Sequence, residues 1–471
     1  PLLGQGLMSG RVTETTVLLQ SRLTQSETLM DGDLPGAPGV ARFEVSGSKD
    51  FATPRRTPWM DAEAENDFIV KCKVGDLAPG TRYYYRLVYG ADKTATKTSP
   101  TATFRTLGGK TEVRPTRLAI VTGMNYFFFH EGAYKPETAY QGPDKALGYP
   151  ALASIKKLAP DYFVGTGDTV YFDHPAKSEK KRWMGTAWTD RARTEPEMRR
   201  KYHEQFVQPR FIELFRDTPT YWEIDDHEYR YNDSDNSGDK LPTPAMGKKN
   251  FKEQLPVVDP ADPDAPTHGT FRISRDLQIW TLEGRFYRSP NKMKDGPEKT
   301  IWGAEQKAWL KRTLLESDAT IKLMISPTPM VGPDGRGKKD SHVNVGGFRH
   351  EGDEFFAFLQ EHGFKDKNFY IVCGDRHWQY HAVHPTGIQE FSTGALVDGN
   401  SRYGVKAGTE NSTDPEGLID QKYCMLPGVG EPSGGFLTVT VTPQDSGAEI
   451  AFDFYDEQGT KVYAHTEKAE R

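Results

Sequence analysis

Acidic side chains and histidines gather at three points of the chain, and each point follows a run of β-forming residues. Open α/β sheets place their chemistry at the carboxyl ends of strands, so these points are expected to meet. Carboxylates, imidazoles and a phenol brought together there would form a multi-metal site, which favours a metal-dependent phosphoesterase. The three segments, in chain order, are 167–173, 225–228 and 374–377.

The first and third segments supply the predicted ligands of one metal ion. Two metal ions a few ångströms apart suit phosphoester hydrolysis, because together they neutralise charge and generate a nucleophile at moderate pH. Asp168 is the candidate bridging ligand, Tyr171 could supply a phenolate, and His377 would bind the same ion. A glycine and an aspartate after a strand also form simple turns, so the prediction rests on all three segments together.

The second segment begins with two adjacent aspartates, which repel each other unless a cation lies between them. Asp225 or Asp226, together with Asp375, would complete the oxygen ligands of a second ion. His227 could protonate the leaving oxygen as a general acid.

Composition excludes several classes of protein. A net charge of −6 over 471 residues does not indicate a nucleic-acid partner, and no apolar stretch approaches the ~20 residues of a membrane span. Three cysteines without a CxxC pair argue against a disulfide framework and a zinc-thiolate site. No Gly-x-Ser-x-Gly sequence supports a serine hydrolase. Scarce cysteine and an opening at Pro1 fit a processed periplasmic or secreted protein, and a trimmed sequence fits equally.

Residues 1–108 are predicted to form an all-β domain. Short β-rich runs alternate with Pro- and Gly-bearing turns, and a Pro-Gly turn at 79–80 leads into the tyrosine-rich run 83–85. This arrangement is typical of the tyrosine corner in immunoglobulin-like and fibronectin-like sandwiches. An ordinary hairpin with aromatic cross-strand pairs would give the same pattern.

Residues 116–471 are predicted to form an α/β catalytic domain. Strands alternate with amphipathic helices at 149–158, 304–317 and 351–363, which predicts a mostly parallel sheet covered by helices. The β-rich runs of the tail, after residue 435, are expected to extend this domain. Residues 232–268 are rich in Asp, Pro and Gly and are predicted to be one long loop that forms a wall or lid of the site.

The three segments resemble motifs of the alkaline phosphatase D family of metallophosphoesterases, which is related to the purple acid phosphatases. The resemblance implies a fibronectin-like domain at 1–108 and an αββα sandwich at 116–471. It also implies a ferric ion held by aspartate, tyrosine, histidine and a cysteine thiolate, with calcium beside it. The matching residues are Gly167, Asp168 and Tyr171, then Trp222 with Asp225 to Glu228, then Gly374, Asp375 and His377, and Asn232 as the counterpart of a metal-binding asparagine.

The sequence departs from the family where the cysteine is expected, because Gly123 stands there and cannot bind a metal. Asn125 could be a replacement oxygen ligand or a helix cap. Zinc, manganese or calcium alone would also fit an oxygen-rich site. Arg288, in a Tyr-Arg pair that the family shares, could hold a phosphate oxygen or form a surface salt bridge. Residues 332–339 are expected to form a basic loop on the substrate rim.

These observations predict hydrolysis of phosphate monoesters or diesters at a site with two or more metal ions. A phospholipase D-like or nuclease-like diesterase is the alternative within the same chemistry. An alternative of another class is a non-catalytic surface binding protein with a vestigial metal site. The expected partner is a small phosphoester, and the sequence leaves the oligomeric state open.

Overall fold

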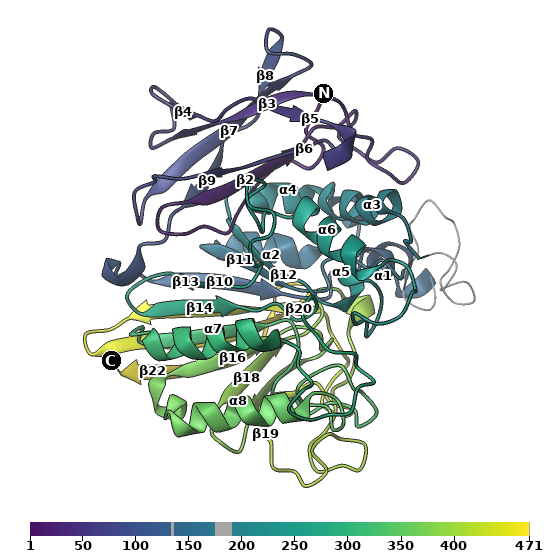
Figure 1. Cartoon of the computed structure of the whole chain (residues 1–471), viewed down its shortest axis with the longest axis vertical. Helices are drawn as coiled ribbons and strands as arrows, with labels where there is room; N and C mark the ends of the chain where they lie inside the picture. The colour runs from purple at the N-terminus through teal and green to yellow at the C-terminus, as the bar shows by residue number, and fades with distance from the viewer. Residues whose placement is uncertain (133–135, 175–190, 471) are drawn as a thin grey trace.

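Two large β-sheets pack face to face in the computed structural model, which describes residues 1–132, 136–174 and 191–470 (Figure 1). The first sheet has nine strands in the order β22-β21-β20-β10-β11-β12-β1-β2-β6. The strands of this sheet from the second part of the chain are β10 (Thr116–Val121), β11 (Tyr162–Thr166), β12 (Thr220–Glu223), β20 (Gly435–Pro443), β21 (Gly447–Asp456) and β22 (Lys461–Glu470).

The second sheet has seven strands in the order β13-β14-β15-β16-β18-β17-β19. Its central strands β14, β15, β16 and β18 run parallel, and its outer pairs are antiparallel. Its members are β13 (Gly269–Arg272), β14 (Leu277–Thr281), β15 (Ile321–Ser326), β16 (Phe369–Cys373), β17 (Gln379–Val383), β18 (Gln389–Thr393) and β19 (Asp420–Cys424).

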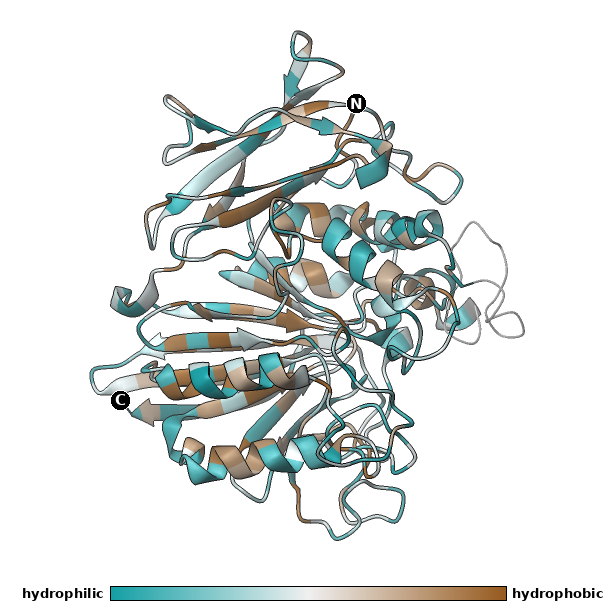
Figure 2. Cartoon of the chain, in the orientation of Figure 1, coloured by the Kyte–Doolittle hydropathy of each residue, from teal (hydrophilic) through white to brown (hydrophobic). Residues whose placement is uncertain are grey.

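Alternation along the strands divides their side chains between two hydrophobic layers. In β10, Leu118 and Ile120 join the core between the sheets, whereas Ala119 and Val121 face the helices. A strand with apolar residues at every position is buried on both faces, and Figure 2 shows hydrophobic residues gathered on the strands. The sheets are therefore the two inner layers of a four-layer sandwich.

Helices form the two outer layers. The first sheet packs against α2, α3, α4 and α6, and the second against α7 and α8 (Figure 1). None of the helices in the described ranges is both long and apolar enough to cross a bilayer. The helices are α1 (Tyr126–Glu131), α2 (Pro150–Leu158), α3 (Glu195–Phe206), α4 (Pro209–Phe215), α5 (Asp226–Tyr229), α6 (Pro244–Gln254), α7 (Gly303–Glu316) and α8 (Arg349–Glu361).

The first 108 residues contribute strands to two sheets. Three of these strands extend the nine-stranded sheet, and Gly10 of β1 pairs in parallel with Thr220 of β12. The others form a separate six-stranded sheet that covers them (Figure 1). The strands are β1 (Leu7–Gly10), β2 (Val17–Arg22) and β6 (Ile69–Val74), then β3 (Gly39–Ser46), β4 (Arg55–Arg56), β5 (Met60–Ala62), β7 (Arg82–Gly90), β8 (Thr96–Thr98) and β9 (Ala102–Arg105).

Two predictions about the fold were wrong. The sheets are mixed rather than mostly parallel, because hairpins at their edges add antiparallel strands on both sides of the parallel centres. Residues 232–268 are not one long loop, because α6 forms within them. Thr243 caps α6 by accepting a hydrogen bond from the Met246 amide, and Pro244 occupies its first turn.

Candidate metal centre

The three predicted segments meet where the two sheets approach each other. β11 and β12 are parallel neighbours in the first sheet, and β16 belongs to the second. Thr166, at the end of β11, donates a hydrogen bond of 3.1 Å to the Ser326 carbonyl of β15, which joins the sheets at this edge. A Cβ on Gly167 would lie 2.4 Å from the Asp225 Cβ, so only glycine lets these segments pack so closely.

Asp168, Tyr171 and His377 form the first part of the site. The Tyr171 hydroxyl donates to Asp168 Oδ2 at 3.0 Å, and His377 Nε2 lies 2.9 Å from the same oxygen. The hydroxyl also lies 3.4 Å from His377 Nε2. All three side chains are buried. The structure thus brings together the three residues predicted to hold one ion, although they come from two different sheets.

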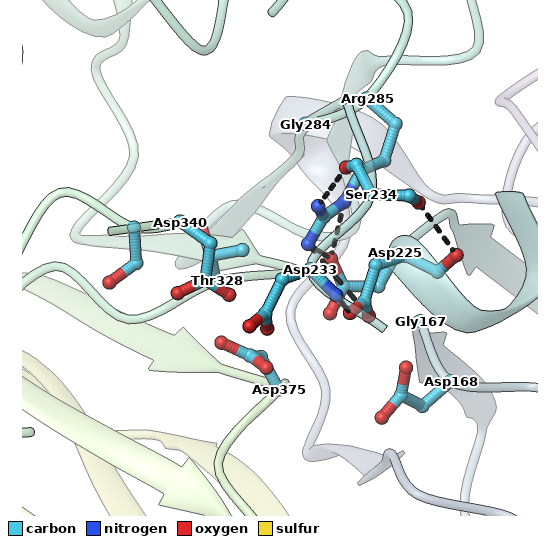
Figure 3. A network of polar contacts seen from close by, with 12 residues as sticks. Gly167, Asp168, Asp225, Asp233, Ser234, Gly284, Arg285, Thr328, Asp340 and Asp375 are labelled. Atoms are coloured by element: carbon cyan, nitrogen blue, oxygen red, sulfur yellow. Dashed lines mark hydrogen bonds and ion pairs between the residues drawn. The ribbon is translucent and has the colours of Figure 1, made fainter. Parts of the chain in front are cut away.

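Asp225, Asp226 and Asp375 form the second part, with one oxygen of each within 4.8 Å of the others. A second group, whose ligand atoms also lie within 4.8 Å of one another, consists of Asp168, Asp226 and His227. Asp226 therefore belongs to both groups. Figure 3 shows Asp168, Asp225 and Asp375 around one region, with Asp233 and Asp340 beside them. The two predicted halves therefore form one continuous site.

Arg285 is the main protein cation of the second part. Its Nε donates to Asp225 Oδ1 at 2.8 Å, and its Nη1 donates to the Ser234 carbonyl at 2.8 Å (Figure 3). The guanidinium is fully buried, and its charge lies 3.9 Å from Asp226. Arg285 at Asp225, and Arg376 at 2.9 Å from Asp375, thus compensate part of the negative charge of this group.

His227 is held by Asp173, the last residue of the first predicted segment, to which the sequence assigned no role. Asp173 Oδ1 lies 2.7 Å from His227 Nδ1, and Asp173 Oδ2 accepts a hydrogen bond from the Asn232 amide. Asp173, His174 and His227 form a third group whose ligand atoms lie within 4.8 Å of one another. The other ring nitrogen of His227 is left for the site, as a proton donor requires.

Burial and mutual repulsion set the pKa values of the carboxylic acids. Burial, followed by neighbouring carboxylates, raises the pKa of Asp168 and Asp225 well above the ordinary range. Burial also raises the pKa of Asp375 to about 7. Burial opposes the charged form of His227, but Asp173 and Asp226 raise its pKa well above the ordinary value. Such perturbation is typical of functional sites.

Several buried oxygens fit metal ions as their missing partners. Asp168 Oδ1, Asp225 Oδ2 and Asp226 Oδ1 accept no hydrogen bond from the described residues. Buried carboxylate oxygens without partners are costly, and cations satisfy them directly. The donor set of carboxylates, imidazoles and a phenol is one that hard metal ions prefer. The buried residues therefore fit a multi-metal site.

The position of the expected cysteine is adapted to glycine. Gly123 has a φ of +66°, and a Cβ there would lie 2.8 Å from both Cα and Cβ of Ala395. Asn400 fills the space beside it, because its amide donates to the Tyr171 hydroxyl at 2.8 Å and to the Gly123 carbonyl at 3.3 Å. A thiolate has no room here without movement of the 395 backbone.

Asn125 caps a helix, which is the second of the two roles expected from the sequence. Its Oδ1 accepts a hydrogen bond of 3.0 Å from the Phe128 amide and caps α1. Its Nδ2 lies 3.0 Å from His174 Nδ1. The side chain is fully buried. Both polar groups thus have protein partners, and Asn125 fixes the position of His174.

Asn232 and Arg288 lie outside the metal-ligand groups of the described residues. Asn232 is exposed and lines a pocket beside the site. Arg288 is buried; its Nε donates to the Gly284 carbonyl at 2.8 Å, and it does not line that pocket. Their roles as metal ligand and phosphate ligand stay predictions.

The pocket beside the site has a volume of about 220 Å³. His227, Asp375 and His377 form its side toward the metal-binding residues. Gly335 and Lys338 of the predicted basic loop also line it, so this loop does lie on the rim. The remaining lining residues are Asn232, Asp334, Arg376, Trp378, Arg402 and Val405.

Sequence reasoning missed residues that reach the site from loops. Asp173 is the last residue of the first predicted segment but was assigned no role, and His174 directly follows it, so extending that segment by one residue would have found His174. Asn400 and Asp340 follow no strand-end pattern, and only the folded chain brings them close. Asp340 is buried, and neither of its oxygens accepts a hydrogen bond within the described ranges.

Comparison with known proteins gives the class of the fold. A solved structure of PhoD is similar with a TM-score of 0.75, at 18% sequence identity over 99% of this chain and 90% of that chain. A purple acid phosphatase from yellow lupin seeds is similar with a TM-score of 0.60, at 11% identity over 98% of this chain and 74% of that chain. The fold is that of the metallophosphoesterase αββα sandwich, preceded by an all-β segment.

Sequence comparison then identifies the family. Residues 134–443 match the PhoD-like phosphatase family, and residues 1–108 match the N-terminal domain of PhoD-like phosphatases. No curated protein matches the chain. The chain belongs to the PhoD-like phosphatase family and is a phosphoric ester hydrolase, as the motifs predicted.

Proposed function

We propose that the protein hydrolyses phosphate monoesters, diesters or both at a site that holds two or more metal ions. The observation that carries this proposal is the shared position of Asp226, which belongs to two adjacent groups of metal-binding side chains. Bound metal ions would supply Lewis-acid neutralisation of the ester oxygens and a nucleophile at moderate pH.

The residues of the chain have separate roles in this proposal. Asp168 and Asp226 lie between the two parts of the site and would be shared ligands, with Tyr171 and His377 on one side and Asp225 and Asp375 on the other. An ester held between the two parts of the site would have a fixed orientation before it reacts.

His227 would donate the proton that the leaving oxygen needs. It lines the pocket, and Asp173 fixes its ring through Nδ1, which directs the other nitrogen into the site. Asp173 and Asp226 raise the pKa of His227, which favours the protonated ring that a general acid needs. The general acid and the pocket thus lie on the same side of the metal-binding residues.

The identity of the metal ions is also a proposal. Iron and calcium follow from the resemblance to the family, but Gly123 leaves no thiolate to hold iron. The remaining ligands are oxygens and imidazoles, so zinc, manganese or calcium alone fits them as well.

Elemental analysis of the purified protein, run beside hydrolysis of nitrophenyl phosphate and bis-nitrophenyl phosphate, tests the proposal. About two metal ions per chain and turnover that a chelator abolishes are the expected results. The preferred ester would then separate a monoesterase from a diesterase. A protein without bound metal, and without turnover after reconstitution with iron, calcium, zinc or manganese, would contradict the proposal.

A further inference from the structure

The pocket beside the metal centre carries cations that the proposed chemistry does not use. Arg376 pairs with both acidic lining residues, with Asp334 at 2.8 Å and with Asp375 at 2.9 Å. Lys338 and Arg402 also line the pocket. The three cations of the lining, Arg376, Lys338 and Arg402, thus outnumber its two carboxylates, Asp334 and Asp375.

Arg402 is the free cation of this pocket. Its backbone amide donates to the His377 carbonyl at 2.7 Å, which fixes the residue beside a predicted metal ligand. Its side chain is exposed, and the described residues provide its guanidinium with neither a hydrogen bond nor an ion pair. An arginine offers a planar fork that matches a phosphate or carboxylate.

Lys338 is the second cation, and it is held in place. Its Nζ lies 2.6 Å from Asp233 Oδ1, and its side chain is 32% exposed. The basic loop that carries it is anchored because the Arg336 amide donates to the Asn411 carbonyl at 2.9 Å. A fixed cation costs little entropy when an anion binds.

We propose that Arg402 and Lys338 form a second anion site at the mouth of this pocket. The enzyme then prefers phosphoesters whose leaving group carries a further phosphate or carboxylate a few atoms from the scissile ester. This inference rests on the proposed hydrolysis at the metal centre. Trp378 and Val405, which also line the pocket, would pack against the carbon atoms between the two anionic groups.

A matched pair of substrates tests the inference: propyl phosphate and propane-1,3-diyl bisphosphate, which differ only in the second phosphate. The metal-loaded protein should hydrolyse the bisphosphate with a kcat/KM more than about twofold higher, because its two equivalent esters alone account for a factor of two. Arg402→Ala should lower kcat/KM for the bisphosphate at least about fivefold more than for propyl phosphate, as expected for one partly exposed charged contact. The loss should fall on KM, and Arg402→Lys should restore part of it.

The control is Arg82→Ala, which removes an exposed arginine of β7 that does not line the pocket. This variant should leave both kcat/KM values as in the wild type. Equal losses for the two substrates in Arg402→Ala, or no preference for the bisphosphate in the wild type, would overturn the inference.

Calorimetric binding of propane-1,3-diyl diphosphonate and propylphosphonate, which keep the spacing of the two substrates, separates this inference from the proposed function. Tighter binding of the diphosphonate that depends on Arg402 supports the anion site, even if neither ester is hydrolysed. Absence of hydrolysis of these two esters and of both nitrophenyl esters by the metal-loaded protein would contradict the proposed function. Equal affinity for the two phosphonates would contradict the anion site, whatever the turnover.

Discussion

Asp168 is the residue on which the two parts of the metal centre depend. It has a φ of +52°, in the left-handed region that few residues other than glycine and asparagine adopt readily. This conformation turns the chain after β11 so that the carboxylate faces both Tyr171 and His377. Strain of this kind is typical of functional sites.

Asp168→Asn should abolish turnover while the protein stays folded. The amide loses the negative charge that two metal ions would share, so the loss should exceed the roughly 10- to 100-fold that follows removal of an outer partner of a metal ligand. Asparagine also tolerates the left-handed backbone. Steady-state kinetics and metal content measure the effect.

The control for this variant is Asp262→Asn, in an exposed loop of the described chain. Thermal unfolding of the metal-free proteins completes the comparison. Because the change removes a buried carboxyl whose pKa is raised, Asp168→Asn should unfold no earlier than the wild type. Full activity in Asp168→Asn would refute its role as a shared ligand.

Gly123→Ala should destabilise the protein more than the same substitution does at another glycine with a positive φ. The new Cβ meets Ala395 at 2.8 Å, so overpacking of about 1–3 kcal/mol adds to a backbone cost of about 1–2 kcal/mol. Gly428 has a φ of +85° and open space around it, so Gly428→Ala measures the backbone cost alone. Denaturant unfolding gives both values.

Gly123→Cys extends this comparison to the metal. It should be at least as unstable as Gly123→Ala and should not gain iron in elemental analysis, because the thiol lacks space beside Asn400. A stable variant that purifies with iron would show that the 395 backbone moves easily and that the site can accept a thiolate.

The site was predictable where chemistry follows a strand directly. Asp168, Asp226 and His377 each lie within a few residues of a strand end, and parallel strands bring such ends to one edge. Asn400 was not predictable, because it comes from a short helical turn, Asp398–Asn400, whose position depends on the whole C-terminal region. Local patterns do not encode such long-range placement.

Among the elements, α3 connects the catalytic region to the N-terminal strands through one buried histidine. His203 Nδ1 lies 2.6 Å from Asp33 Oδ1, and its Nε2 lies 2.7 Å from Asp67 Oδ2. Arg22 of β2 pairs with Asp67 at 2.9 Å. This network holds the helix layer against the first sheet at a point far along the sequence from each partner.

Asp67→Asn should cost about 3 kcal/mol of unfolding free energy at pH 5, because one partner of a buried ionic network is lost. Burial alone would raise the pKa of Asp67, but His203 and Arg22 hold it below its ordinary value. A carboxyl group whose pKa is lower in the folded than in the unfolded state stabilises the fold at pH values above its unfolded pKa, near 4. This stabilisation disappears as the pH falls through the pKa of the folded state.

Denaturant unfolding between pH 5 and pH 2 tests the direction of this pH dependence. The difference in stability between wild type and Asp67→Asn should shrink steadily below pH 4. Asparagine tolerates the left-handed backbone of this position, where φ is +52°, so the change isolates the charge. A difference that does not vary with pH would contradict the ionic origin.

Element types were predictable, but strand partners were not. The apolar periodicity of 304–317 and 351–363 identified α7 and α8, and the runs before Asp168 and Asp375 identified β11 and β16. Periodicity does not reveal which strands are neighbours, so the division into two mixed sheets and the pairing of β1 with β12 were invisible. The boundaries at 108 and 116 stay predictions, as does periplasmic or secreted localisation.

For the whole molecule, removal of metal should lower stability, because the centre joins the two sheets. A ligand that binds only the folded state adds about 2.7 kcal/mol at a free concentration 100 times its Kd. Calorimetric unfolding with and without a chelator should show this loss, and adding the metal back should reverse it. Identical unfolding under both conditions would argue against metal ions bound among Asp168, Asp226 and Asp375.

The pairing of β1 with β12 has a consequence for how the chain is made. Thr220 leaves the ribosome about 210 residues after its partner Gly10, which at 5–20 residues per second is roughly 10–40 seconds later. Until then β1 is an open sheet edge, which invites wrong pairing with other chains. β1 must therefore wait for the middle of the chain before its pairing is complete, so the speed of translation bears on the yield of folded protein.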